Sequence, residues 1–261
     1  MGLFNMHYDR PGPGVNPDTP RKKGAARFFE VLGRDMTSFW CAGMLALLSA
    51  LPFALGLALS LMTHAVLIML VAGALGGMIA APQLTGLQDT ILRSLRDEPG
   101  YWWATYRRVW KRNVKGSLLP GAVGGLILGM QVFAAWHLAA GQGSMLSVLL
   151  VGLVLLGGLA QYIFAQVALL DLPFASLLKN AVLLFFGYLP RTLLGVLWQG
   201  AYWGVLVLFF PISAPVLLVT SFWLPALLSL MAIYPPLEKS FHIEETIRKM
   251  REDQLNGQDP S

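Results

Sequence analysis

The sequence predicts an all-α, polytopic membrane protein: a bundle of about six transmembrane helices, with interfacial helices on its cytoplasmic side. The 261-residue chain is 56% hydrophobic and only 13% charged, whereas soluble domains are about 25% charged. Apolar runs of roughly 20 residues, the length that crosses a bilayer, alternate with polar windows that contain all nineteen Lys and Arg residues. These windows are residues 1–37, 85–116, 171–191 and 238–261.

The distribution of basic residues also predicts an orientation. Lys and Arg near the ends of spans favour the cytoplasmic face, and six spans would place all four windows on that one side. We therefore expect a multi-pass protein of the bacterial cytoplasmic membrane with both termini inside. Its expected parts are a Pro-rich N-terminal region with a short amphipathic helix (1–37), a transmembrane domain (38–237) with a cytoplasmic loop (85–116), and a cytoplasmic tail (238–261).

The first two spans are predicted to form a helical hairpin. Phe39 to Leu61 is apolar and follows Thr37 and Ser38, either of which could cap the start of a helix. Pro52 near the middle of this run predicts a kink. Ala65 to Leu84 is the second run, so the turn between the two should lie outside the cell.

The largest internal loop comes next. Asp97 to Gly100 is a strong turn signal, and a polar helix is expected from Tyr101 to Lys115. The third apolar run is Ser117 to Ala140, and a charge-free outer turn, Gly141 to Gly143, leads to the fourth, Ser144 to Leu170.

The last part of the chain contains an ambiguous segment. Phe174 to Leu189 is apolar but contains Lys179, and it is shorter than the roughly 17 residues that a span needs. We place it at the inner interface or slanted into the bundle. Arg191 to Phe210 is the predicted fifth span and Val216 to Ile233 the sixth. The tail from Phe241 to Met250 has the pattern of a short amphipathic helix.

Glycines recur inside the spans at the spacing that lets helix backbones approach closely. Packing within one bundle is the expected use, and contact between copies in a homo-oligomer is the alternative. The residues are Gly73 with Gly77, Gly121 with Gly125 and Gly129, and Gly200 with Gly204.

The helix predicted from Tyr101 to Lys115 is amphipathic. Aromatic residues recur at i, i+3 and i+7 on one face and basic residues at i, i+4 and i+7 on another. This pattern predicts an interfacial helix that binds anionic lipid headgroups or docks a cytoplasmic or membrane protein. Nucleic acid is not an expected partner, because membrane proximity explains the same residues. The candidate contact residues are Trp103, Tyr106, Arg107, Arg108, Trp110, Lys111, Arg112 and Lys115.

Polar residues inside the spans are mostly amides, with no carboxylate or Lys among them. Ion-coupled transporters usually need ionisable groups near the bilayer midplane, so this class is disfavoured. The amides are expected to make interhelical hydrogen bonds; the alternative is a facilitated pathway or channel for a small neutral solute. Its candidate lining residues are Gln131, Gln161, Gln166 and Gln199.

Catalytic patterns are missing from the sequence. The histidines His7, His64, His137 and His242 show no paired spacing, and Cys41 is a single cysteine. Neither a zinc-protease motif nor a nucleophile elbow or phosphate loop occurs. We therefore predict no enzyme activity, no cofactor and no metal site.

Three stretches resemble the YesL-like family of bacterial integral membrane proteins, a family without an established activity. They are Ser49 to Pro52, Ile91 to Asn113 (ILRSLRDEPGYWWATYRRVWKRN) and, for one branch, Arg10 to Val15. Members are often encoded beside carbohydrate-uptake systems of the ATP-binding-cassette type, so the resemblance implies an accessory or regulatory role near such a system. The Glu-Ala-Ala loop by which permease subunits engage their ATPase is replaced here by QDTILRSLRDEP, so the chain is not expected to be the permease.

Overall fold

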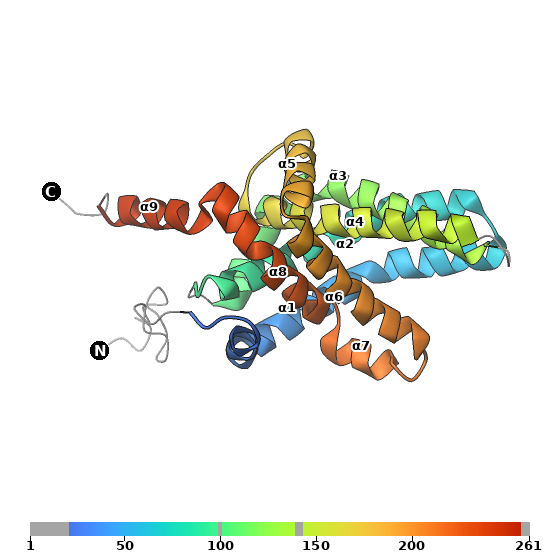
Figure 1. Ribbon diagram of the computed structural model, residues 1–261, viewed down its shortest axis with the longest axis horizontal. Coiled ribbons are helices and arrows are strands. Elements are labelled where there is room, and N and C mark those ends of the chain that lie inside the picture. The colour runs from blue at the N-terminus through green and yellow to red at the C-terminus, as the bar shows by residue number, and fades with distance from the viewer. Residues whose placement is uncertain (1–20, 99–100, 139–142, 257–261) are drawn as a thin grey trace.

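The computed structural model describes residues 21–98, 101–138 and 143–256, and every regular element within these ranges is a helix (Figure 1). The Pro-rich stretch of the N-terminal region, the end of the Asp97 to Gly100 turn, most of the turn before Ser144 and the last five residues lie outside them. The helices are α1 (Ala25–Thr63), α2 (Val66–Leu95), α3 (Trp102–Trp136), α4 (Gly143–Leu169), α5 (Phe174–Gly187), α6 (Leu189–Leu208), α7 (Ala214–Thr220), α8 (Trp223–Phe241) and α9 (Ile243–Asn256).

The fold is an all-α polytopic membrane bundle. Helices α1 to α4 are each long and apolar enough to cross a bilayer, with mean hydropathies of 1.8 to 2.2 in their most apolar windows. Only 11% to 33% of the residues in those windows are buried within the protein, so most of this apolar surface faces outward, as lipid contact requires. Two further spans exist if the bent pairs α5–α6 and α7–α8 each count as one.

Helix α1 begins earlier than predicted. Thr37 and Ser38 lie inside it, because the helix is continuous from Ala25 through Pro52 to Thr63. In Figure 1 its first turns are seen nearly end-on, whereas the rest runs along the long axis of the molecule. The short amphipathic helix expected before residue 38 is therefore the bent start of α1.

The polar loop predicted between the second and third spans is also mostly helix. Helix α2 continues past Leu84 to Leu95, and α3 runs without a break from Trp102 to Trp136. A separate interfacial helix at Tyr101 to Lys115 was therefore the wrong expectation. Residues 102–115 form the first part of a spanning helix, because they pack along α2 and continue into the apolar part of α3 without a break.

The ambiguous segment from Phe174 to Leu189 forms helix α5 over most of its length. The 14 residues of this helix extend about 21 Å, which is less than the roughly 30 Å of a hydrocarbon core. It meets α6 at an angle of 101°, so α5 and α6 are not one straight span. In Figure 1 α5 stands across the direction of the long helices.

The predicted sixth span is broken in its first third. Helices α7 and α8 meet at 56°, at Ser221, which has a left-handed φ of 38°. The hydroxyl of Tyr202 donates to the Ser221 carbonyl at 2.8 Å and fixes the break against α6. Helix α8 then continues through Pro235 and Pro236 to Phe241, beyond the predicted end at Ile233.

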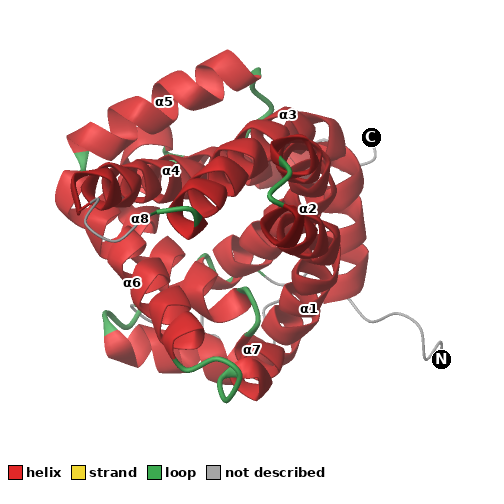
Figure 2. Ribbon diagram, turned by 90° about the vertical axis from the view of Figure 1, so that its right-hand side faces the viewer, coloured by secondary structure: helices red, strands yellow, loops and turns green. Residues whose placement is uncertain are grey.

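Viewed along the long axis, α2 lies between α1 and α3, and α4 continues the row towards α6 and α8 (Figure 2). Glycines make the α2–α3 contact close: a Cβ on Gly125 would lie 2.8 Å from Gly77 Cα, and one on Gly121 would lie 2.5 Å from the Gly77 oxygen. The predicted packing role of these stripes is confirmed. Gly200 and Gly204 instead have open space where a Cβ would be.

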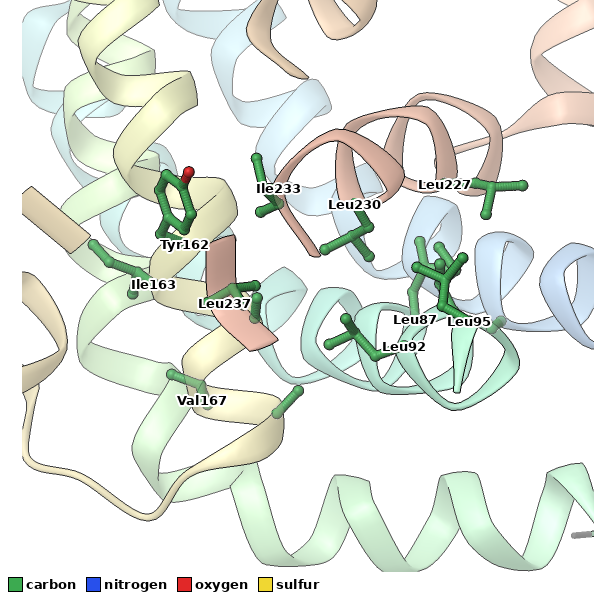
Figure 3. Close-up of a cluster of buried hydrophobic side chains, with 14 of the residues drawn as sticks. Leu87, Leu92, Leu95, Tyr162, Ile163, Val167, Leu227, Leu230, Ile233 and Leu237 are labelled. Carbon is green, nitrogen blue, oxygen red and sulfur yellow. The ribbon is translucent and has the colours of Figure 1, made fainter. Parts of the chain in front are cut away.

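The largest buried cluster lies where α2, α4 and α8 meet. Figure 3 shows leucines of α2 and α8 packed together with Tyr162 and Ile163 of α4. Leu227, Ile233 and Leu237 of α8 are completely buried. This core supports the end of the molecule that contains the start of α1, the α2–α3 junction and α9 (Figure 1). We call that region the charged end.

Candidate functional site

A cluster of arginines around Asp97 organises the charged end. Asp97 follows the C-terminus of α2 and has a left-handed φ of 59°. Its Oδ2 accepts hydrogen bonds from Arg27 and Arg21, each at 2.8 Å, and its Oδ1 accepts one from Arg34 at 2.5 Å. Three cations from the N-terminal part of the chain therefore converge on one carboxylate. We call these four residues the Asp97 clamp.

The same arginines also cap helix α2. Arg34 donates to the carbonyl of Ser94 at 2.6 Å, and Arg27 to that of Leu95 at 2.9 Å. The last carbonyls of a helix have no partner within the helix and carry its negative dipole end. The clamp therefore satisfies them and fixes the start of α1 against α2.

The clamp changes the acidity of its carboxylate. Burial alone would raise the pKa of Asp97, but the hydrogen bonds and positive charges of Arg27 and Arg34 outweigh it. The pKa consequently lies below its usual value of 3.8. Asp97 thus remains ionised at neutral pH.

Other acidic residues at this end are also paired. Arg93 binds Asp89 at 2.7 Å and Glu98 at 3.0 Å, and Arg96 binds Glu98 at 2.7 Å. In the tail, Glu244 accepts hydrogen bonds from Arg21 and Tyr234, both at 2.6 Å. On α9, Lys249 pairs with Glu245 at 2.8 Å.

A small polar cavity of about 60 Å³ lies beside this network and is lined by Asp35, Asp89 and Glu98 among others. Within the described ranges, no group of three or more His, Cys, Asp and Glu side chains is placed to hold a metal ion. The cavity is the size of a few water molecules.

The predicted aromatic residues of α3 are placed differently from one another. Trp103 is 47% exposed, but Tyr106 is only 4% exposed. The Tyr106 hydroxyl donates to Gln83 Oε1 at 2.5 Å, and its ring lies over Gly86, where a Cβ would come within 2.7 Å of it. Tyr106 therefore packs against α2 and is not part of an exposed face. Trp110 is half-buried, and its indole nitrogen has no hydrogen-bond partner among the described residues.

The predicted basic residues of α3 are exposed, but one of them has a structural role. Arg112 donates through Nη2 to the carbonyl of Ala168 at 3.0 Å and so caps the C-terminus of α4. The other four make no ion pair with any residue in the described part of the chain. They are Arg107, Arg108, Lys111 and Lys115, and we call them the α3 cations.

The four glutamines do not form one lining. Gln161 donates to the Thr192 carbonyl at 3.3 Å and accepts from Ser229, which in turn accepts from Gln199 at 3.0 Å. Gln166 is fully buried and donates to the carbonyls of Tyr162 and Leu177. These amides join α4 to α5, α6 and α8 by hydrogen bonds, as the interhelical interpretation predicted.

Gln131 lies on α3, apart from the other three glutamines, where its amide faces Gly152 of α4. The polar cavity beside the Asp97 clamp includes none of the four glutamines among its lining residues, and neither does an apolar groove between α2 and α3 that is lined by Leu75, Ile79 and Leu118.

Sequence reasoning missed two clusters. Arg27 and Arg34 are seven residues apart and therefore share a helix face, which could have indicated a common partner, but Asp97 was interpreted only as a turn residue. At the opposite end of the bundle, His64 Nδ1 lies 2.7 Å from His137 Nε2. These residues are 73 positions apart, so no local spacing could have paired them.

No protein-family model, curated protein or solved structure matches this chain.

Proposed function

We propose that the protein is an accessory component of the bacterial cytoplasmic membrane that docks an acidic partner protein through two of the α3 cations, Arg108 and Lys115. The observation that carries this proposal is a contrast within the charged end. The Asp97 clamp pairs Arg21, Arg27 and Arg34 with a carboxylate, whereas the α3 cations make no ion pair with a described residue. Exposed charges without an internal counter-ion are available to an external one.

The position of these cations supports docking near the membrane surface. Arg108 and Lys115 are exposed on a helix whose later part, from about Leu118, is apolar enough to span the bilayer. The continuous helix of α3 and its close contact with α2 hold them rigidly relative to the bundle. A partner bound here would be placed beside the membrane, which is where a subunit of an uptake system would lie.

The resemblance to the YesL-like family indicates which kind of partner to expect. Members are often encoded beside carbohydrate-uptake systems. We therefore favour an accessory or regulatory role near such a system of the ATP-binding-cassette type. The cytoplasmic location of both termini belongs to the same proposal and is supported by the basic windows.

The test is recovery of the partner from native membranes in mild detergent. We would compare the unmodified protein with a double variant, Arg108→Gln with Lys115→Gln, leaving Arg112 intact because it caps α4. We expect the variant to keep its melting temperature and to lose an acidic protein that co-purifies with the unmodified chain. Raising salt from about 0.1 M to about 0.5 M should release the same protein, because salt screens exposed charges.

The matched control is Lys249→Gln, which removes an exposed cation of α9 at the same end. Recovery of the same partner by the double variant and the unmodified protein, at equal yield, would exclude Arg108 and Lys115 as its docking site.

A further inference from the structure

An apolar groove runs along the outer side of the α2–α3 pair. Its volume is about 410 Å³. Its apolar part is formed by Leu75, Met78 and Ile79 of α2 and by Leu118 of α3, and its polar part by Gln83 and Trp110. Leu75 and Ile79 are 54% and 51% exposed, so the groove opens on the surface that faces lipid.

The two parts of the groove lie in order along the helices. Gln83 is the lining residue of α2 nearest the charged end, and Leu75 lies eight residues further into the apolar part of that helix. Eight residues correspond to about 12 Å. The groove therefore changes from polar to apolar in the direction from the charged end towards the middle of the spans.

The polar part contains an unsatisfied hydrogen-bond donor. Trp110 Nε1 is buried and has no acceptor among the described residues, whereas the neighbouring Gln83 Oε1 is already occupied by the Tyr106 hydroxyl. Because Trp110 Nε1 is not accessible at the surface, an acceptor on a bound molecule would reach it only after a small rotation of the indole ring, and would then remove the free-energy cost of the unpaired donor.

Two of the α3 cations lie on the groove side of α3. At about 100° per residue, Arg107 is roughly 60° around the helix from Trp110, and Lys111 roughly 100° in the same sense. Lys115 and Arg108 are roughly 140° and 160° away in that same sense, farther from the groove. Arg107 and Lys111 thus flank the polar end of the groove, and Arg108 does not.

We propose that this groove binds one anionic phospholipid. Its phosphate accepts hydrogen bonds at the polar end, from Trp110 Nε1 and from Arg107 and Lys111. One acyl chain lies along Leu75, Ile79 and Leu118. Only an amphiphile with a negative headgroup matches unpaired cations, a free N–H donor and an apolar wall in this order, because a zwitterionic lipid carries its own counter-charge.

This site goes beyond the proposed function, since it concerns a lipid and uses the other two α3 cations, Arg107 and Lys111. Its test is titration of the purified, delipidated full-length protein with phosphatidylglycerol, and separately with phosphatidylcholine, followed by native mass spectrometry. The unmodified chain should bind one phosphatidylglycerol in preference to phosphatidylcholine. Glycerol phosphate, which has the headgroup anion but no acyl chain, should not displace it.

Three variants test the parts of the site separately. Arg107→Gln with Lys111→Gln should weaken phosphatidylglycerol binding about 30-fold, roughly a factor of five for each cation. Trp110→Phe removes only the N–H donor and should weaken it several-fold. Ile79→Trp fills the apolar part, leaves both cations in place and should abolish binding.

The control is the pair Arg108→Gln with Lys115→Gln, which should retain the lipid while losing the protein partner. Equal affinity of the unmodified chain for the two lipids would overturn the proposal. So would an equal loss in both double variants, because that result means that diffuse surface charge, and not the groove, attracts the lipid.

Discussion

Arg27 of α1 donates to Asp97 Oδ2 at 2.8 Å and, through the same Nη2 atom, to the carbonyl of Leu95 at 2.9 Å. One guanidinium nitrogen thus links the bent start of α1, the C-terminus of α2 and the residue that follows it. The start of α1 also packs into the hydrophobic core through Val31, with Phe28 and Leu32 beside it. The clamp adds the polar contacts that hold this part of α1 against the C-terminus of α2.

Asp97→Asn should lower the melting temperature at pH 7. Losing hydrogen bonds to a charged group costs about 2 kcal/mol, or roughly 4 to 8 °C in a chain of this size. Because the folded-state pKa of Asp97 lies below its unfolded value, its carboxylate stabilises the fold above about pH 3.8 and this contribution is lost as the pH falls through the lower pKa. Thermal melts of the purified protein between pH 7 and pH 3 would measure this.

The stability difference between Asp97→Asn and the unmodified protein should accordingly shrink towards pH 3. Glu245→Gln is the control, because it breaks an exposed pair with Lys249, and water screens such a pair so that it adds little to stability. A difference that stays constant across the pH range would show that the ionised carboxylate is not what the clamp requires.

Gly77→Leu should disrupt the α2–α3 pair. A side chain at Gly77 would collide with the backbone of Gly121, and backbone atoms cannot rotate away, so the cost should reach or exceed about 3 kcal/mol. Gly204→Leu is the matched control, since nothing lies within 4 Å of a Cβ there. Thermal stability and size-exclusion profiles in detergent would compare them. If Gly204→Leu proved equally harmful, α6 would pack against a second copy of the chain.

Reconstituted protein should give no flux of glycerol or small sugars above that of empty liposomes. Gln161 and Gln166 are buried and use their amides in hydrogen bonds between helices, so they are not available to a passing solute. Radiolabelled uptake into liposomes that contain only this protein would measure it. Saturable flux that is lost in Gln161→Leu, while the protein remains folded, would contradict this prediction and support the hypothesis of a solute pathway.

The two ends of the bundle should react from opposite sides of the membrane. In a chain whose single cysteine is replaced, Cys41→Ser, a new cysteine at Ser144 should react with an impermeant maleimide in intact cells. One at Arg108 should react only after permeabilisation. Both positions are exposed, so access to the reagent and not burial decides the result. The reverse pattern would invert the predicted orientation.

The apolar runs predicted most of the helices because their physical requirement is local. A segment such as Ser144 to Leu170 must be helical in lipid to satisfy its own backbone, and α4 closely matches it. Helix ends were less predictable. The expected helix start at Tyr101 is close to the observed one, but Leu84 and Lys115 were placed at boundaries because polarity changes there, whereas α2 continues to Leu95 and α3 to Trp136.

The candidate site was predicted only as a set of residues. Periodicity correctly identified the basic residues of α3 as exposed, yet it grouped Tyr106 with Trp103, although the former is buried under α2. The α2–α3 register is set by the glycine contact around Gly77, which periodicity within one helix cannot give. The partners of Asp97 come from positions 63 to 76 residues away, beyond any local pattern.

By itself, the sequence determined that this is an all-α membrane protein and that its basic residues lie in four windows, because both properties follow from the composition of segments about 20 residues long. Tertiary structure alone decided which of those basic residues are free. Arg27 and Arg34 neutralise Asp97, Arg112 caps α4, and the α3 cations make no ion pair with a described residue. The distinction depends on distances between helices, and those are set by packing across the bundle.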